Sequence, residues 1–276
     1  MRLVERGQKL LLHTIINVFL LAMALFAILP FLYMVFTSLR QVYSLIDFNF
    51  RLSELNFNNY KAVFQNFPFL LYFRNSLICV IGSCALNILV SAMAGYGFAK
   101  KKFAGREVIF FLFLATMMIP GQVTMIPIYM IFNRLKMLNT YSALILPVVG
   151  AFGVFLMRQF MNSLPDELIE AAQIDGCGET RLFIKIVLPS VRPVIISLTI
   201  FTFISVWNDF VWPLIVVTDD SHTTLTLGLS TLSGMYKTNY GLVMAGSTLT
   251  FLTPFLLYIF LQRQFIEGIV MTGIKG

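Results

Sequence analysis

Charged residues are scarce in this chain. Asp, Glu, Lys and Arg make up 12% of the 276 residues, whereas apolar residues make up 58%. A soluble domain carries about 25% charged and about 45–50% apolar residues. The composition therefore excludes an ordinary soluble enzyme, a disordered chain and a coiled coil, and it indicates a membrane protein.

Cysteine and histidine are also rare, and one common motif is missing. The three cysteines (Cys79, Cys84 and Cys177) provide no disulfide framework. The two histidines, His13 and His222, lie far apart and have no partner at metal-ligand spacing, so we expect no metal site. No stretch matches the phosphate-binding pattern G-x-x-x-x-G-K-[ST], so we expect no ATP site in the chain itself.

Long uncharged runs separate the few charged residues. Each run is long enough to cross a bilayer as a helix of about 20 residues. Lipid cannot form hydrogen bonds with the backbone, so these segments must satisfy their backbone N–H and C=O groups internally, as a helix does. The sequence therefore predicts an all-α integral membrane protein with six transmembrane helices in a single domain, 1–276. The predicted spans are 11–38, 75–99, 108–131, 139–158, 193–217 and 241–262.

The distribution of basic residues predicts the orientation. With both termini in the cytoplasm, 13 of the 20 Lys and Arg residues fall in cytoplasmic segments. Cytoplasmic loops carry an excess of such residues, so we expect this orientation. The longer connections are then a cytoplasmic loop at 159–192 and external loops at 41–70 and 218–241.

The cytoplasmic loop contains a complete short-helix pattern between Ser163 and Gly176. Pro165 suits a first helical turn, acidic residues follow it, and Gly176 suits a left-handed stop. Four apolar residues are expected on one face of this helix: Leu164, Leu168, Ala171 and Ala172. A second helix is expected from Glu179 to Val187. These faces are too short to form a core of their own. Lying on lipid headgroups is the alternative, but the first helix is acidic, which favours docking on a basic protein surface.

The same loop resembles the EAA loop of permease subunits of binding-protein-dependent ABC importers. The triplet Glu170-Ala-Ala, then Asp175-Gly176, then Phe183, Ile186 and Leu188-Pro189 follow that family's order and spacing. The rest of the chain resembles its MalG-type carbohydrate branch, notably Trp207-Asn-Asp-Phe210 and the tail from Gln262 to Gly276. For the fold, the resemblance implies an N-terminal helix ahead of a five-helix core.

For function, the resemblance implies a sugar permease that is not itself an enzyme. It would lie in the bacterial inner (cytoplasmic) membrane, pair with a homologous MalF-like permease, receive sugar from an extracytoplasmic binding protein and be driven by an ATPase dimer. That dimer would bind ATP and magnesium, and this chain would need no cofactor. The residues implied to couple with the ATPase are Glu170, Ala171, Ala172, Asp175, Gly176, Phe183, Ile186, Leu188 and Pro189.

Three further sets of residues are candidates for transport. Asp209 is an acid inside a predicted span, so it is a candidate for the cavity or gate, together with Trp207 and Asn208; a structural hydrogen bond is the alternative. The resemblance makes the external loop a contact for the binding protein and the tail an ATPase contact, whereas a solvated loop and a frayed end are the alternatives. These residues are Gly228, Ser230, Thr231, Ser233 and Gly234 in the loop, and Phe265, Gly268, Gly273, Lys275 and Gly276 in the tail.

A secondary transporter and a membrane enzyme are two alternative classes of membrane protein. A stand-alone secondary transporter needs several ion-coupling residues near the midplane and inverted repeats, and a membrane enzyme needs a catalytic set at a membrane face. The sequence shows one intramembrane acid, no evident repeat and no such set. It does not identify the sugar, and maltodextrins, α-galactosides, polyols and glycerol phosphate are all carried by similar subunits.

Overall fold

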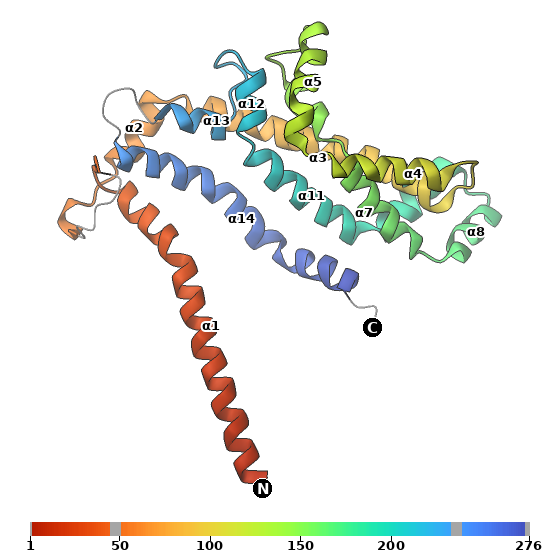
Figure 1. Ribbon diagram of the computed structural model, residues 1–276, viewed down its shortest axis with the longest axis horizontal. Coiled ribbons are helices and arrows are strands. Elements are labelled where there is room, and N and C mark those ends of the chain that lie inside the picture. The colour runs from red at the N-terminus through yellow and green to blue at the C-terminus, as the bar shows by residue number, and fades with distance from the viewer. Residues whose placement is uncertain (1, 45–50, 233–238, 274–276) are drawn as a thin grey trace. The chain divides into compact units, whose positions relative to one another are not determined.

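The computed structural model describes residues 2–44, 51–232 and 239–273. Every regular element in these ranges is helical, as the sequence predicted (Figure 1). The α-helices are α1 (Arg2–Ser38), α2 (Asn58–Asn66), α3 (Phe69–Lys100), α4 (Arg106–Ala115), α5 (Gly121–Arg134), α6 (Tyr141–Ile145), α7 (Ala151–Asn162), α8 (Asp166–Ile174), α9 (Glu179–Leu182), α10 (Leu188–Ser190), α11 (Arg192–Trp207), α12 (Val211–Val216), α13 (Leu225–Leu229) and α14 (Tyr240–Gly273).

Three of these helices are long and apolar enough to cross a membrane by themselves. They contain the candidate spans Leu12–Ser38, Phe69–Lys100 and Tyr240–Phe260. Three bent pairs of helices also qualify if each pair counts as one span, which gives up to six. The first, second and sixth predicted spans are therefore single helices, and the third and fourth are bent pairs. The last bent pair, Glu179–Ser190 with Arg192–Trp207, combines part of the predicted cytoplasmic loop with part of the fifth predicted span.

Proline and glycine account for two of the breaks. The third predicted span bends by 102° between Met118 and Gly121. Ile119 and Pro120 are extended there, because the proline ring disfavours a helical conformation in the residue before it. The fourth predicted span bends by 45° where Val149 and Gly150 are extended.

The fifth predicted span, 193–217, is also interrupted. It consists of α11 and α12, and the break between them contains Asn208, Asp209 and Phe210. Helix α11 is preceded by a helical run, Glu179–Ser190, which is bent by 76° relative to it. That run includes a π-helical turn at Phe183–Val187 and continues to Ser190, so the second loop helix does not end at Val187 as predicted.

The contacts within the chain define two compact units. The first unit comprises residues 1–68 and 231–251, and the second comprises residues 69–230 and 252–276. In the first unit, the Asn59 amide donates to the carbonyl oxygens of Ser38 and Arg40, at 2.9 and 2.7 Å. A Cβ at Gly241 would overlap the Arg40 carbonyl oxygen, so only glycine fits at the start of α14.

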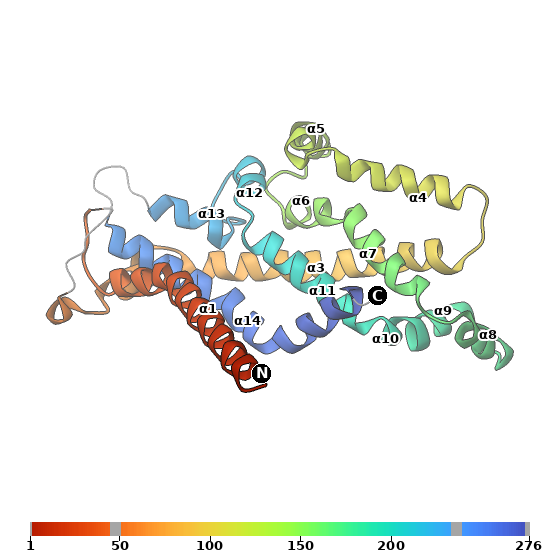
Figure 2. The same cartoon turned by 60° about the horizontal axis from the view of Figure 1, so that its bottom comes forward.

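In the second unit, α7 and α11 lie alongside the long helix α3 (Figures 1 and 2). Gly95 and Gly153 allow α3 and α7 to pack closely, since a Cβ at Gly95 would approach the Met157 Cβ to 2.6 Å. Small residues at the contact are the usual means of close helix packing in membranes. At the Lys100 end of α3, the apolar core continues into the loop that follows α7.

Candidate functional site

The 159–192 loop folds onto the Lys100 end of α3. Helix α8 begins directly after Pro165, which is extended, and ends at Ile174. Gly176 follows two residues later, and its φ of +75° is the left-handed stop that the sequence predicted. The Gly176 N–H donates to the Gln173 carbonyl and the Cys177 N–H to the Ala172 carbonyl. This pair of hydrogen bonds is a Schellman motif, which satisfies the last carbonyls of a helix.

The inner face of α8 packs on the chain's own core. Ile169 and Ala172 are buried in one cluster with Leu182, Met157 and Met161. Two expectations were therefore wrong: Leu168 and Ala171 are exposed and do not share the face of Ala172, and that face packs on a core within the chain instead of needing a partner surface. The contacts with the core turn Ile169 and Ala172 inward, so Leu168 and Ala171 point away from it.

The coupling candidates thus divide into an exposed group and a packed group. Glu170, Ala171, Asp175, Gly176 and Pro189 are exposed. Phe183, Ile186 and Leu188 are partly buried against the core, and Ala172 is 7% exposed. Ala172 therefore cannot contact another protein in this conformation.

The outer side of the loop keeps an apolar character. Leu168, Ile174 and Ile184 are 43%, 86% and 55% exposed. Together with Ala171 and Glu170 they form what we call the outer face of the loop. An apolar surface beside a carboxylate, held on a fixed scaffold, is suited to receiving a protein partner.

Ion pairs fix the loop to the end of α3. The Lys100 ammonium donates to the Leu164 carbonyl and to Asp166 Oδ1, both at 2.6 Å, and this pairing holds the pKa of Asp166 below its usual value. The Lys101 ammonium lies 2.5 Å from Glu179 Oε1, which also accepts from the Tyr96 hydroxyl at 2.6 Å. These contacts, together with the shared apolar core, join the loop to the end of α3.

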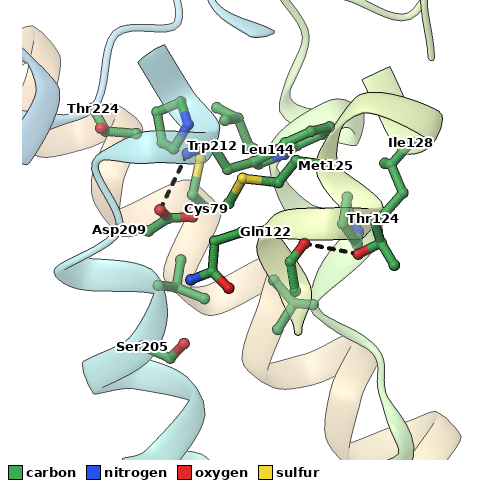
Figure 3. A pocket seen from close by; sticks show the side chains of 15 residues that line it. Cys79, Gln122, Thr124, Met125, Ile128, Leu144, Ser205, Asp209, Trp212 and Thr224 are labelled. Carbon is green, nitrogen blue, oxygen red and sulfur yellow. Dashed lines mark hydrogen bonds between the residues drawn. The ribbon is translucent and has the colours of Figure 1, made fainter. Parts of the chain in front are cut away.

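A second polar site lies at the break between α11 and α12 (Figure 3). Asp209 lines a cavity of about 400 Å³, and its Oδ1 accepts the Trp212 N–H at 3.3 Å. Gln122 and Thr124 reach the same cavity from α5, and Ser205 reaches it from α11. The predicted cavity role of Asp209 is compatible with this position, and the capping hydrogen bond to Trp212 matches its structural alternative.

The two other predicted cavity residues lie elsewhere. Trp207 is 2% exposed and stacks on Phe203, with ring centroids 5.6 Å apart, so it belongs to the core rather than to the cavity. Asn208 is exposed and its amide donates to the Ile204 carbonyl at 2.9 Å, which caps α11. The Trp-Asn-Asp order gave no sign of which side chain points inward, because the helix ends within it.

The loop that follows α12 is tied down on α3 and α6. The Asn75 amide donates to the Ser221 and Thr223 carbonyls at 2.9 and 3.0 Å, and it accepts from the Tyr141 hydroxyl at 2.7 Å. Hydrogen bonds from Ser221, through its side chain and its N–H, hold the pKa of Asp219 below its usual value. This part of the loop is thus anchored to the fold at Thr223 and Thr224, which are buried, whereas residues 218–221 are exposed.

The predicted binding-protein contacts follow this anchored segment. Gly228 is buried in α13, whose apolar residues pack on α3, so it is not available for contact. Ser230 and Thr231 are exposed. Ser233 and Gly234 lie outside the described residues. In the tail, Phe265, Gly268 and Gly273 belong to α14, and Lys275 and Gly276 lie outside the described residues.

Comparisons with known proteins identify the family. The family described as "Binding-protein-dependent transport system inner membrane component" matches residues 87–269, which include the 159–192 loop, α11 and Asp209. The chain belongs to this family. The predicted family is therefore confirmed, and the chain is a membrane permease component.

Several relatives match over most of their length. The chain is 36% identical to the arabinooligosaccharides transport system permease protein AraQ of Halalkalibacterium halodurans, over 99% of this chain and 100% of that protein. It is 34% identical to the lactose transport system permease protein LacG of Rhizobium radiobacter, over 94% and 96%. It is 36% identical to the sn-glycerol-3-phosphate transport system permease protein UgpE of Pectobacterium atrosepticum, over 74% and 73%.

A solved structure shows the same fold. A chain of a bacterial ABC transporter involved in the import of the acidic polysaccharide alginate superposes with a TM-score of 0.80, over 91% of this chain and 96% of that chain. The sequence identity is 21%, so the likeness establishes the family's helical fold and no more.

Several residues that build these sites were missed by the sequence analysis. Ile169 and the partners Lys100, Tyr96 and Glu179 position the loop, and Gln122 and Ser205 line the cavity. The acidic start of α8 and the basic end of α3 were both visible. Their pairing was not predicted because Lys100 and Asp166 are 66 positions apart in the sequence.

Proposed function

We propose that this chain is the permease subunit of an ATP-driven importer that moves a saccharide from an extracytoplasmic binding protein into the cytoplasm. Family membership and relatives named for arabinooligosaccharides and lactose support this proposal. A second permease would complete the translocation path, and a separate ATPase dimer, which binds ATP and magnesium, would supply the energy. This chain would itself hold no cofactor.

The observation that carries the proposal is the loop on the end of α3. Its inner face is anchored by the core and by the Lys100 and Lys101 ion pairs, while its outer face is exposed. A partner that moved the outer face would therefore move α3 as well. We propose that the ATPase docks here and that closure of the ATPase dimer switches access to the cavity.

The exposed acid at position 170 suits a basic partner. Glu170 lies on the outer face beside Ala171, where a small side chain leaves room for close approach. Such a carboxylate would accept charge-assisted hydrogen bonds from Arg or Lys across the interface. We propose Glu170, Ala171 and Ile174 as the centre of the interface. Phe183, Ile186 and Leu188 would support it from beneath.

The remaining partners are assigned in the same proposal. The orientation with both termini in the cytoplasm places the 159–192 loop on the ATPase side and Ser230 and Thr231 on the binding-protein side. The tail, including Phe265, would extend along the ATPase. A secondary transporter working alone would use neither the exposed outer face nor the family's binding protein, so we do not favour it.

Reconstitution tests the proposal. The chain, its partner permease and its ATPase are placed in proteoliposomes, and saccharide uptake is measured with and without ATP and the binding protein. We expect uptake only when both are present. Uptake driven by an ion gradient without ATP would contradict the proposal. Labelling of Cys177 in intact cells tests orientation, since reaction with an impermeant reagent from outside would reverse it.

A further inference from the structure

Two hollows adjoin each other along α11. The cavity of about 400 Å³ at Asp209 shares two lining residues, Val148 and Ser205, with a second hollow of about 280 Å³. The second hollow is bounded by Asn87 on α3, Gly150 at the start of α7, and Thr202. Together the hollows form a track along one side of α11. Its volume falls in the range of about 300–1,000 Å³ that is usual for small-molecule sites.

The side of α11 that faces the track carries polar groups among apolar ones, which are Leu198, Phe201 and Val206. Thr202, Ser205 and Asp209 follow one another at intervals of three and four residues, which places them on the same side of the chain. Thr202 Oγ1 accepts from the Asn87 amide at 2.9 Å. Polar groups in membrane segments are costly unless they face a polar cavity or a partner. A row of hydroxyl, amide and carboxylate groups in hollows therefore indicates a path for a polar solute.

The track carries negative charge only. Asp209 is the only acidic side chain lining it, and no Lys, Arg or His lines either hollow in the described part of the chain. Phosphate and carboxylate groups are normally recognised by Arg, Lys or helix N-termini, and a carboxylate in low dielectric repels them. Neutral hydroxyl groups, in contrast, can donate to Asp209 and exchange hydrogen bonds with Gln122 and Ser205.

We propose that this track carries the solute itself and that it is selective for a neutral, polyhydroxylated saccharide over phosphorylated or uronic acid-containing ones. This inference rests on the proposed function. It divides the relatives by chemistry: the solutes named for the arabinooligosaccharide and lactose permeases fit the track, whereas those named for the glycerol-3-phosphate permease and for the alginate transporter carry negative charge.

Two glycines make the track testable. A Cβ at Gly121 or at Gly150 would meet no atom within 4 Å, and these residues line the larger and the smaller hollow, respectively. Gly121→Phe and Gly150→Phe therefore add bulk to the track from positions where the Cβ itself has room. Gly97 on α3 has the same open surroundings but lines neither hollow, so Gly97→Phe is the matched control. Ser205→Leu, which narrows the point shared by both hollows, adds an independent variant.

The assay uses the complete transporter in proteoliposomes, with uptake and binding-protein-stimulated ATP hydrolysis measured together. The probes are a neutral oligosaccharide, glycerol 3-phosphate and an oligouronate. We expect neutral uptake to exceed uptake of either anion at least tenfold. We expect Gly121→Phe, Gly150→Phe and Ser205→Leu to lower neutral uptake at least tenfold while stimulated ATP hydrolysis stays within twofold, and Gly97→Phe to change neither.

The possible failures are distinct. Wild-type uptake that prefers an anion would overturn the inferred selectivity, and neutral uptake that is unchanged in all three track variants would overturn the track. Both results leave the importer itself in place. Absence of ATP-dependent uptake of any of these solutes by the wild type would instead refute the proposed function. Should one phenylalanine variant fail to assemble, Ser205→Leu and the other phenylalanine variant still decide the result.

Discussion

The adjacent alanines of the EAA triplet offer a sharp test, because the structure gives them opposite surroundings. Ala172 is 7% exposed and packs in the cluster that contains Ile169 and Leu182, whereas Ala171 is exposed on the outer face. Ala172→Leu would add three carbons to a packed core, which costs about 1–3 kcal/mol in stability. Ala171→Leu adds the same volume at the surface, where substitutions usually change stability by no more than about 0.5 kcal/mol.

The two variants should therefore fail in different assays. For Ala172→Leu we expect a lower thermal unfolding temperature of the purified permease pair. For Ala171→Leu we expect an unchanged unfolding temperature but a loss of ATPase retained on the pair, since bulk at a close contact separates the surfaces. A loss of about 1.4 kcal/mol in binding would appear as tenfold weaker retention.

The reasoning has a clear refutation. Equal unfolding temperatures for the two variants would mean that Ala172 is not held in the core. A destabilised Ala171→Leu with normal ATPase retention would mean that the outer face lies against the chain itself. Gln173→Met, at an exposed position of the same helix that is not part of the outer face, serves as the control that should change neither quantity.

Three further predictions follow from individual side chains. Glu170→Lys should weaken ATPase retention at least about 30-fold, because breaking a buried charge pair costs roughly 2–5 kcal/mol. Glu167→Lys should lose only a helix-dipole interaction of about 0.3–1 kcal/mol. Equal, small losses of ATPase in a pull-down would show that Glu170 is not at the interface. Asp209→Asn should retain assembly and lower uptake, while normal uptake with a lower unfolding temperature would make the residue purely structural. Gly241→Ala should destabilise the first unit by at least about 1–3 kcal/mol, because the Cβ overlaps the Arg40 carbonyl oxygen; in thermal unfolding, Gly97→Ala is the matched variant that should behave as the wild type.

Local sequence features predicted much of the secondary structure. The uncharged runs gave the helices, Pro165 preceded α8, and Gly176 ended it, because each depends on the residue itself and its immediate neighbours. The bend at Pro120 also depends on the residue itself, but the bend was not predicted because the apolar run continues through it. An apolar run indicates that a segment can lie in lipid, not that it is straight.

Features that depend on distant contacts were not predicted. The burial of Ile169 instead of Leu168 depends on how α8 meets α7 and α9, which no pattern within one helix contains. Trp207 was expected at the cavity, yet its ring stacks on Phe203 in the core. The track along α11 was missed for the same reason, since Gln122 and Asn87 come from other helices.

Site-specific cross-linking at the outer face tests the central claim most directly. A photoreactive amino acid at position 171 is compared with one at Leu112 on α4, which is also exposed, in the transporter purified with its ATPase subunit. We predict a cross-link from position 171 to the ATPase, altered in yield when ATP binds, and none from position 112. A complex that imports saccharide but gives no ATPase cross-link from position 171 in either nucleotide state would contradict the account.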